Sequence, residues 1–411
     1  MLGAAIRWIP AENSRQMETS SVVTPEASPP EPLAWPARIL KSATTRRILL
    51  VVASFIFALS LIEFPALINV LDYRVIFGEN FAWWPANNRN DPELIHIRRP
   101  YVHFSGETRG GGITAGYRIP PSDMTFYRWD VKCDHNGFRN DVDLKSADII
   151  VIGDSMVEGL TVPTPELTTS LLAELQGKVV ANLGQSAYGP QQELVVLKRY
   201  GLPLHPRNII WMFSESTDLN DVVYYDRVMN DPPDFLHAFW ARSFTKIAWV
   251  ELFHGSKKSG ALRAGVFESS DNKPVTAYFT TRSLPLTKQN LGAIDETAQI
   301  VAEAHRLSAA QGARFIFVFV PDKFRVLHEF CRFSEESECR NWPMNDMPVR
   351  VEKAVRSISP DIGYLDLTSK LVDTARTGVL PYYSDDEHWS PVGHKVAAEA
   401  INSYLLSMES Q

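Results

Sequence analysis

The sequence predicts an α/β protein built on a three-layer, doubly wound parallel sheet, preceded by a transmembrane helix. From residue 147 onward, short β-branched runs alternate with longer amphipathic segments, the pattern of a parallel sheet wrapped by helices. The chain has 411 residues and is 45% hydrophobic, which suits one large domain with a substantial core. A 24-residue apolar run, 48–71, stands ahead of that domain.

The predicted domain, residues 147–411, contains five strands and four longer helices. The expected strands are 148–152, 179–182, 208–213, 314–320 and 363–366, and the expected helices are 165–175, 190–200, 294–311 and 391–407. The last helix begins at Ser390-Pro391, a preferred N-cap followed by proline at the first helical position. An aromatic-rich insertion, 222–293, interrupts the domain and is either a substrate-shaping lid or a structural flap.

The first 146 residues predict three segments. Residues 1–46, rich in Pro, Ser, Thr and Glu, predict a disordered leader. Residues 47–71 form the transmembrane helix, and four basic residues before it place the N-terminus in the cytoplasm and the rest in the periplasm or outside the cell. A cleaved signal peptide and a buried core helix are the alternatives. Residues 72–146 are rich in aromatic and turn residues and are expected to pack on the catalytic domain.

Composition excludes some classes of function. The net charge is −7, and no basic run is interleaved with aromatic residues, so nucleic-acid binding is not expected. The three cysteines lack the paired spacing of a zinc site, and no metal or cofactor is predicted. Cys331 and Cys339 could close a short loop as a disulfide in an oxidising compartment or remain free thiols, with Cys133 unpaired in either case.

A serine nucleophile is indicated at the end of the first strand. In DIIVIGDSMVEG, Ser155 follows the strand directly, at the carboxyl edge of the sheet where ligands bind in such folds. Gly153 permits a tight turn, and the segment after it can direct backbone N–H groups at developing negative charge. Taken alone, this motif is equally consistent with an ordinary turn and helix cap.

A serine hydroxyl needs a base, and the C-terminal SDDEHWSPVGH supplies one. His388 stands just before the last helix, and either Asp386 or Asp385 could accept its Nδ1 proton, the other carboxylate then being solvated. An acidic surface turn with an incidental histidine is the alternative. His394 lies on the following helix and is expected to be structural.

Four blocks in order resemble those of the SGNH (GDSL-like) hydrolase superfamily. They are GDS, NLGQSAYGP, FSESTDLND and DDEHWSPVGH, within residues 145–407. The resemblance implies a flavodoxin-like SGNH fold with Ser155 as nucleophile and His388 as base. The final block is similar to the DxHW form of alginate O-acetyltransferase-like proteins, which favours Asp386 as the partner of His388, whereas the commoner DxxH form would select Asp385.

The resemblance also implies an oxyanion hole made of Ser155, Ala187 and Thr217. Ala187 stands where the family usually has glycine, a tolerable change because its backbone N–H is the donor. Thr217 stands where the family usually has asparagine, and its shorter hydroxyl donates one hydrogen bond at most. Asn182 or Asn220 could supply a donor instead. Losing one such donor can cost about 10²–10³ in turnover.

The predicted function is that of an extracytoplasmic serine esterase or O-acyltransferase acting on an acylated carbohydrate or another envelope ester. A transferase would need a membrane partner that delivers acyl groups. The alternative is a binding or assembly module whose oxyanion hole has decayed at Thr217. Arg139, in NGFRND, and Lys323, in VPDK, either face an anionic substrate group or are architectural.

Overall fold

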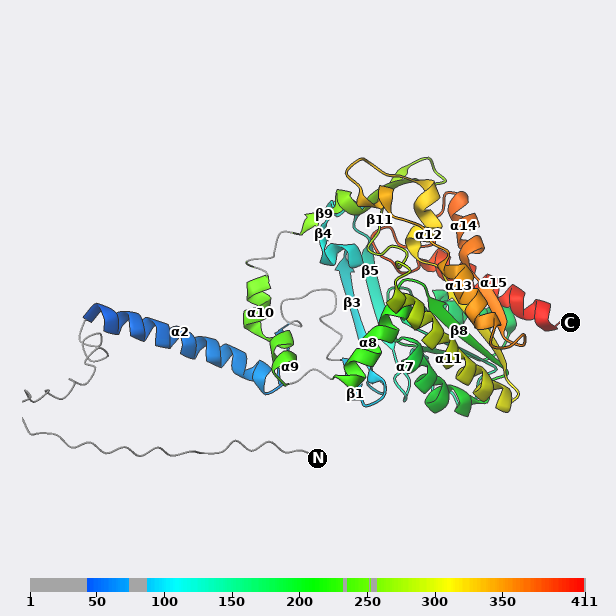
Figure 1. The fold of residues 1–411 in the computed structure, drawn as a ribbon, viewed down its shortest axis with the longest axis horizontal. Coiled ribbons are helices and arrows are strands. Elements are labelled where there is room, and N and C mark those ends of the chain that lie inside the picture. The colour runs from blue at the N-terminus through cyan, green and yellow to red at the C-terminus, as the bar shows by residue number, and fades with distance from the viewer. Residues whose placement is uncertain (1–42, 74–86, 232–234, 251, 253–256, 410–411) are drawn as a thin grey trace, which may run out of the picture. The chain divides into compact units, whose positions relative to one another are not determined.

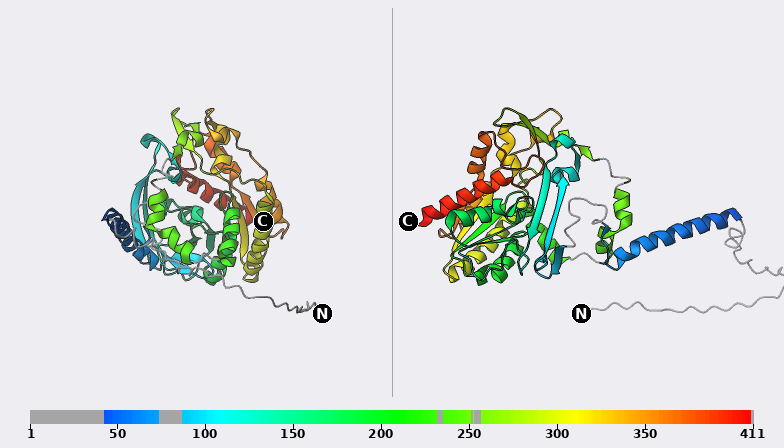
Figure 2. Two further views of the ribbon diagram at one scale, coloured as in Figure 1. Left: turned by 60° about the vertical axis from the view of Figure 1, so that its left-hand side comes forward. Right: turned by 180° about the vertical axis from the view of Figure 1, so that it is seen from behind.

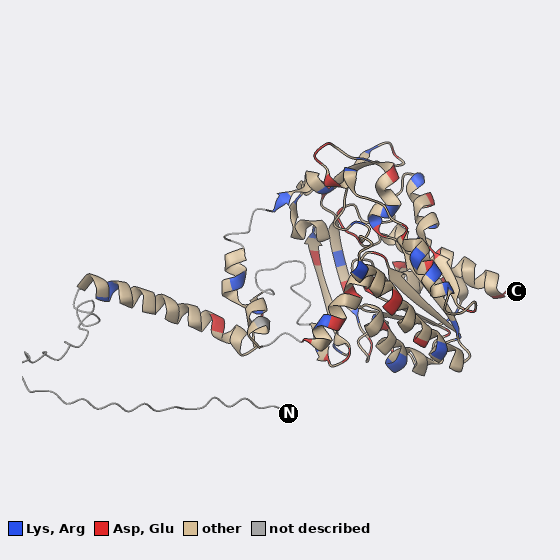
Figure 3. Cartoon of the chain, in the orientation of Figure 1, with Lys and Arg blue, Asp and Glu red and all other residues tan. Residues whose placement is uncertain are grey.

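The computed structural model describes residues 43–73, 87–231, 235–250, 252 and 257–409. The predicted leader, 1–46, lies almost entirely outside them. The chain forms two compact units, residues 1–61 and 62–411, and the larger one holds every element discussed below except most of the first helix. In that unit Lys and Arg are interspersed with Asp and Glu over the elements (Figure 3).

A five-stranded parallel sheet forms the centre of the larger unit and confirms the predicted fold class (Figure 1). Its strands, in spatial order, are β7 (Val180–Gly184), β6 (Ile149–Gly153), β8 (Asn208–Ser214), β12 (Arg314–Val320) and β14 (Gly363–Asp366). All five occur where the sequence predicts them. Numbered along the chain, the order is 2-1-3-4-5, in which the direction of winding reverses between β6 and β8.

Helices cover both faces of this sheet and complete the three predicted layers (Figure 2). One face carries α7 (Pro190–Val196), α8 (Asp218–Asn230), α11 (Lys288–Ala310) and α13 (Met347–Arg356). The other carries α6 (Thr168–Gln176), α12 (Lys323–Leu327), α14 (Thr368–Arg376) and α15 (Pro391–Glu409). The strands are buried on both faces, as β-branched runs in a parallel sheet require.

The predicted helices are present with small shifts, and several further helices, among them α8, α12, α13 and α14, were not predicted. Helix α11 begins at Lys288, six residues before its expected start, because Thr287 caps it by accepting the Asn290 N–H. Helix α15 begins at Pro391 as expected, and the Ser390 hydroxyl donates to the Leu380 carbonyl. Helices α13 and α14 lie in stretches that were left without structure in the sequence prediction.

Several segments outside the central sheet form antiparallel pairs. The stretch before residue 147 contains the pairs β1 (Asn88–Asp91) with β2 (Ile95–Arg98) and β3 (His103–Arg109) with β5 (Phe126–Lys132). The insertion contributes β10 (Ala264–Glu268) and β11 (Pro274–Tyr278), which form a sheet with β13 (Cys331–Arg332). Cys331 and Cys339 are free thiols in this structure, so the possible disulfide is not formed.

The apolar run near the N-terminus forms one helix, α2 (Ala43–Leu67). Its apolar window has a mean hydropathy of 2.4 and none of it is buried, which counts against a buried core helix. Figure 3 shows it almost free of charge between a basic start and one acidic position near its end. Length and composition are compatible with a membrane anchor or a signal sequence.

Candidate active site

The candidate nucleophile lies at the point where the winding of the sheet reverses. Strand β6 ends at Gly153, and Ser155 opens the short helix α5 (Ser155–Glu158). Asp154 caps this helix by accepting the Met156 N–H at 2.8 Å. A Cβ at Gly153 would lie 2.6 Å from the Val157 side chain, so the turn requires glycine there. The carboxyl ends of β6 and β8 meet at this position, which is the usual location of ligand sites in such sheets.

The structure brings the C-terminal histidine to this serine across more than 230 residues of sequence. His388 Nε2 lies 2.8 Å from Ser155 Oγ, and His388 Nδ1 lies 2.5 Å from Asp386 Oδ1. Asp386 Oδ1 also accepts the His388 backbone N–H at 2.9 Å, which fixes the loop that carries both residues. These distances are those of a nucleophile, a base and an orienting carboxylate in hydrogen-bond contact.

Asp385 has a different role from Asp386. Its carboxylate is fully buried and accepts the Gly111 N–H at 3.0 Å, the Thr125 N–H at 2.9 Å and the Tyr127 hydroxyl at 2.7 Å. Of the two aspartates that the sequence left open, Asp386 contacts His388. The expectation that the other carboxylate would be solvated is wrong, because Asp385 is buried. Its hydrogen bonds join the loop that carries His388 to the segment before residue 147.

The same loop is also held from the opposite side. The Lys323 ammonium is buried and donates to the carbonyls of Tyr278 at 2.5 Å, Ser384 at 2.9 Å and Asp386 at 3.0 Å. Burial lowers the pKa of Lys323, although nearby acidic groups oppose that effect. Of the two roles that the sequence left open for Lys323, the architectural one holds, because three carbonyls occupy the donors that would have met an anionic substrate.

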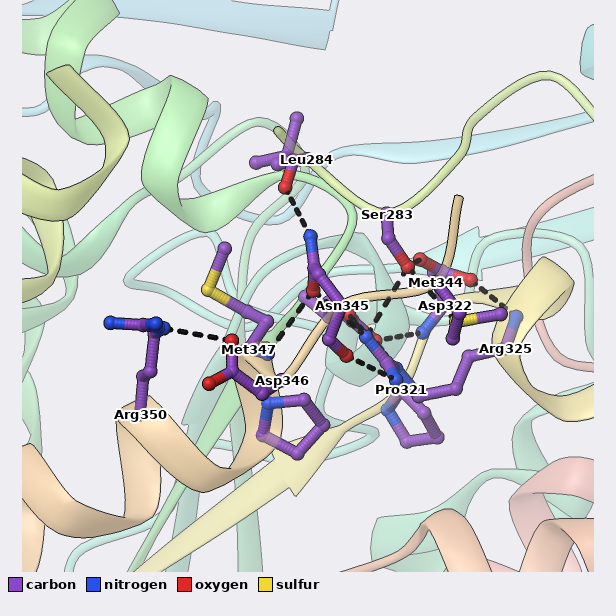
Figure 4. A network of polar contacts seen from close by, with 12 residues as sticks. Ser283, Leu284, Pro321, Asp322, Arg325, Met344, Asn345, Asp346, Met347 and Arg350 are labelled. Atoms are coloured by element: carbon purple, nitrogen blue, oxygen red, sulfur yellow. Dashed lines mark hydrogen bonds and ion pairs between the residues drawn. The ribbon is translucent and has the colours of Figure 1, made fainter. Parts of the chain in front are cut away.

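Neighbouring polar contacts fix the start of α12, from which this lysine projects (Figure 4). Asp322 caps the helix by accepting the Arg325 N–H at 2.6 Å. The Arg325 guanidinium pairs with the buried Glu215 carboxylate at 2.5 Å and donates to the Asn345 carbonyl at 3.1 Å. The Asn345 side chain donates in turn to the Leu284 carbonyl at 2.6 Å. The end of β12 is therefore fixed to the end of β8 through Glu215 and, through Asn345, to Leu284 within the insertion.

The carboxylate of Asp386 and the imidazole of His388 shift each other's pKa in opposite directions. Burial alone would lower the pKa of His388, but the adjacent Asp386 carboxylate raises it to about 9. Burial alone would raise the pKa of Asp386, but the charge of His388 and three N–H donors hold it well below its usual range. Because 41% of the His388 side chain is exposed, water screens part of this attraction.

Two backbone N–H groups near Ser155 are available as oxyanion donors. Within the described residues, neither the Ser155 N–H nor the Ala187 N–H has a hydrogen-bond acceptor. Ala187 adopts a left-handed backbone with φ of 61°, which explains why the resembling family usually has glycine there. The N–H groups on either side of Ala187 are taken, since Ser186 N donates to Glu158 and Tyr188 N donates to the Gln185 carbonyl.

The side chains expected to supplement these donors are engaged elsewhere. The Thr217 hydroxyl donates to Asp154 Oδ2 at 2.9 Å, so its single proton is not directed at a substrate. The Asn182 amide donates to the Val157 carbonyl at 2.8 Å and has Thr169 Oγ1 at 3.3 Å, and Asn220 is exposed on α8. Of the expected donors, the two backbone N–H groups of Ser155 and Ala187 remain without an acceptor among the described residues.

A buried ion pair that the sequence did not predict, between Glu158 and Arg98, holds the turn at Ser186 and Ala187. Glu158 accepts the Ser186 N–H at 2.9 Å and also its hydroxyl, and its other oxygen pairs with Arg98 Nε at 2.8 Å. Both side chains of this ion pair are almost fully buried. Breaking such a pair leaves an uncompensated buried charge, so each partner fixes the other. The only sequence signal was the position of Glu158 inside the GDSMVEG motif.

Arg139 and His394 have structural roles. The Arg139 guanidinium is buried and donates to the carbonyls of Glu158 at 3.1 Å and Val162 at 2.8 Å, so it does not face a substrate. His394 Nδ1 lies 2.9 Å from the Thr168 hydroxyl, and burial lowers the pKa of His394 to about 3. Its neutral ring therefore packs inside the protein, as the sequence suggested.

Replacing Ala187 by glycine should raise the free energy of unfolding by up to about 1 kcal/mol and leave ester turnover unchanged. Glycine relieves the strain of the positive φ while the N–H keeps its direction. Ala187→Val should lower both stability and turnover. His205→Val is the matched control, since His205 is exposed with φ of 53° before β8 begins, and should lower only stability. Denaturant melts and initial rates test both, and full turnover by Ala187→Val would contradict the assigned donor.

In the described part of the chain, no group of three or more His, Cys, Asp or Glu side chains is placed to hold a metal ion.

Comparison with known proteins identifies a family for the C-terminal part of the chain. Residues 278–410 match the family model described as the SGNH hydrolase-like domain of the acetyltransferase AlgX. The matched segment includes His388 and Asp386 but not Ser155. The match covers the last of the four blocks, DDEHWSPVGH, and agrees there with the resemblance to SGNH hydrolases. No curated protein sequence matches the chain.

Solved structures with similarity to the chain are remote in sequence. A putative G-D-S-L family lipolytic protein from Desulfitobacterium hafniense is 12% identical, with a TM-score of 0.34, covering 62% of this chain and 98% of its own. A GDSL-like lipase from Bacteroides thetaiotaomicron is also 12% identical, with a TM-score of 0.33, covering 63% and 88%. A catalytic mutant of the acetylxylan esterase Axe2 from Geobacillus stearothermophilus is 12% identical, with a TM-score of 0.35, covering 64% and 95%.

Proposed function

We propose that this protein is an SGNH-type serine esterase or O-acyltransferase that cleaves or transfers an ester-linked acyl group, in particular acetyl, of a glycan or another cell-envelope substrate. The observation that carries the proposal is the continuous contact from Ser155 Oγ to His388 Nε2, at 2.8 Å, and from His388 Nδ1 to Asp386, at 2.5 Å. The family model that matches residues 278–410 is that of an acetyltransferase domain, which favours an acetyl group.

The first half of the reaction forms an acyl-enzyme. His388 Nε2 takes the Ser155 proton as Oγ attacks the ester carbonyl, and Asp386 stabilises the imidazolium that results. The tetrahedral oxyanion accepts hydrogen bonds from the N–H groups of Ser155 and Ala187. The C–O bond to the leaving alkoxide then breaks, and His388 returns the proton to that alkoxide. The acyl group remains on Ser155 Oγ.

The second half of the reaction decides between hydrolysis and transfer. His388 removes a proton from water or from a sugar hydroxyl, whose oxygen attacks the acyl-enzyme carbonyl. Collapse of the second tetrahedral intermediate returns the proton to Ser155 Oγ. Water gives a free carboxylic acid, whereas a sugar hydroxyl gives a new ester, and the relay serves both without rearrangement.

The proposed location is a membrane surface, with α2 as an uncleaved anchor and the catalytic domain outside the cytoplasm. Its 25 residues span about 37 Å at 1.5 Å per residue, enough for a hydrocarbon core of about 30 Å. Glu63, the only acidic residue in it, accepts the Thr245 N–H at 2.6 Å in the first turn of α10 (Phe244–Trp249). Trp249 and, on α9 (Phe235–Arg242), Trp240 are exposed, as is typical of a membrane–water interface.

The full-length chain, extracted from membranes with detergent, should hydrolyse p-nitrophenyl acetate and bind one fluorophosphonate per molecule at Ser155. Rates and peptide mapping by mass spectrometry measure the two effects. Adding an oligosaccharide acceptor separates transfer from hydrolysis by the ratio of acetylated sugar to acetate. A chain that neither turns over esters nor labels at Ser155 would favour a glycan-binding module, and recovery in the soluble fraction would count against the anchor.

A further inference from the structure

Helix α9 carries large apolar side chains that the protein leaves exposed. Phe235, Leu236 and Trp240 are exposed, and Leu236 is 68% exposed. Together with Phe239 they stand at positions i, i+1, i+4 and i+5, which places all four on one side of the helix. Apolar side chains gathered in this way mark a surface that contacts a membrane or another protein.

Helix α10 adds exposed apolar side chains, and the charges near them are basic. Trp249, at the last position of α10, is exposed, as are Val250 and Leu252 after it. Between residues 235 and 250 the sequence has two basic residues, Arg242 and Lys246, and no Asp or Glu. Aromatic and aliphatic residues combined with Lys and Arg are typical of helices that lie in the plane of a membrane surface.

The end of α2 lies within the larger unit and is joined to both of these helices. Arg242 Nε donates to the Ala66 carbonyl at 2.6 Å, one of the last carbonyls of α2, which have no partner inside the helix. The Glu63 carboxylate accepts the N–H groups of Thr245 at 2.6 Å and Phe244 at 3.3 Å, in the first turn of α10. The end of α2 and the start of α10 therefore satisfy each other's free backbone groups through these two side chains.

With α2 as the anchor of the proposed location, these contacts set the depth of α9 and α10. From Arg47 to Leu67, its last residue, α2 rises about 30 Å at about 1.5 Å per residue, which is the thickness of a hydrocarbon core. Arg47 at one surface of the bilayer therefore puts Leu67 at the other, and Glu63 only about 6 Å deeper along the helix. A carboxylate at that depth needs donors, and α10 supplies two.

We propose that α9 and α10 form a second membrane contact, which lies in the interface of the bilayer that α2 crosses and restricts the orientation of the catalytic domain above it. The inference rests on the proposed location and adds to it the element that orients the domain. The occupant of the surface is lipid: acyl chains contact Phe235, Leu236 and Trp240, and phosphate headgroups contact Lys246. This part of the insertion then binds the membrane, a role beside the lid and the structural flap that the sequence left open.

Spin labels on the full-length chain in vesicles of phosphatidylcholine and phosphatidylglycerol test this contact. Leu236→Cys and Trp240→Cys each add one label, and the labelled wild-type chain gives the background from its three cysteines. Both added labels should relax with oxygen, which dissolves in the bilayer, and lose the response to a water-soluble nickel chelate. Val349→Cys is the matched control, because Val349 is an exposed apolar residue on α13, a helix that packs on the parallel sheet, and its label should respond fully to the chelate.

Two results would overturn the second contact. A response to the nickel chelate at Leu236 and Trp240 equal to that at Val349 places the surface in water. Loss of the response to both oxygen and the chelate means that protein covers it, either a partner or a second copy of the chain. If one of the two cysteine variants does not fold, as judged by circular dichroism, Phe235→Cys takes its place and has the same expected result.

A label at Phe55→Cys, in the middle of α2, separates this inference from the proposed location. Relaxation by oxygen alone at Phe55, with a full chelate response at Leu236 and Trp240, removes the second contact and leaves the anchor. A chelate response at all three positions rejects the anchor and the second contact together. Ester turnover and fluorophosphonate labelling of Ser155, measured on the same vesicles, test the catalytic proposal separately from both.

Discussion

Ser155→Ala should lower kcat/KM for p-nitrophenyl acetate by about 10⁴–10⁶ and abolish fluorophosphonate labelling. Among the described residues, the Ser155 hydroxyl is the hydrogen-bond partner of His388 Nε2, so its removal eliminates the acyl-enzyme and leaves only general base attack by water. His388→Ala should cost a similar factor, and the double variant should be little worse than either single one, because the two groups act as one unit.

Ser308→Ala is the control for loss of a buried serine hydroxyl. Ser308 lies on α11 and donates to the Ala304 carbonyl at 2.7 Å, far along the chain from every proposed catalytic residue. Its replacement should lower stability by about 1 kcal/mol and leave turnover unchanged. Turnover by Ser155→Ala within tenfold of the wild type would show that the activity comes from another group, and the acyl-enzyme mechanism would have to be abandoned.

The parallel sheet was predictable because its strands carry a signal that depends on sequence alone. A strand buried on both faces is apolar along its buried length. In RFIFVFV, the sequence of β12, six apolar residues follow one arginine, and a run this short predicts a strand because a helix would be longer. Helix α13 was missed although Met347, Val351 and Val355 recur at helical spacing, because proline and polar residues surround them. The β3–β5 ribbon was also missed, since HFSGETR has no apolar alternation.

The residues of the candidate site could be predicted from the sequence, but the hydrogen bonds that position them could not. Motifs pointed to Ser155 and His388 because nucleophile and base must be of these types. The resemblance to the DxHW block favoured Asp386, whereas the residues alone left both aspartates open, because their positions depend on contacts with Gly111 and Gly112, more than 270 residues away. The engagement of the Thr217 hydroxyl by Asp154 is likewise a contact between two strand ends that only the folded sheet brings together.

The two adjacent aspartates should respond differently to the same substitution. Asp386→Asn should lower kcat by about 10⁴, because the amide removes the charge that orients and stabilises the imidazolium. Asp385→Asn should lower the free energy of unfolding by about 1–3 kcal/mol with a much smaller loss of turnover, because its three donors then face an amide with one acceptor oxygen. Steady-state rates and denaturant melts of both variants measure the pattern, and the reverse pattern would assign the relay to Asp385.

The pH dependence gives a second test of the same pair. Only neutral His388 can accept the serine proton, and its pKa is raised to about 9, so kcat/KM should rise with pH above the ordinary histidine value of 6.5. The stabilisation from the charged pair runs the opposite way: it is complete below pH 6.5 and is lost as the pH rises through about 9. Between these values the protein gains activity while it loses stability. In Asp386→Asn the rise in activity should shift to lower pH and the loss of stability between pH 6.5 and 9 should disappear. An unshifted activity profile would exclude Asp386 as the group that sets the basicity of His388.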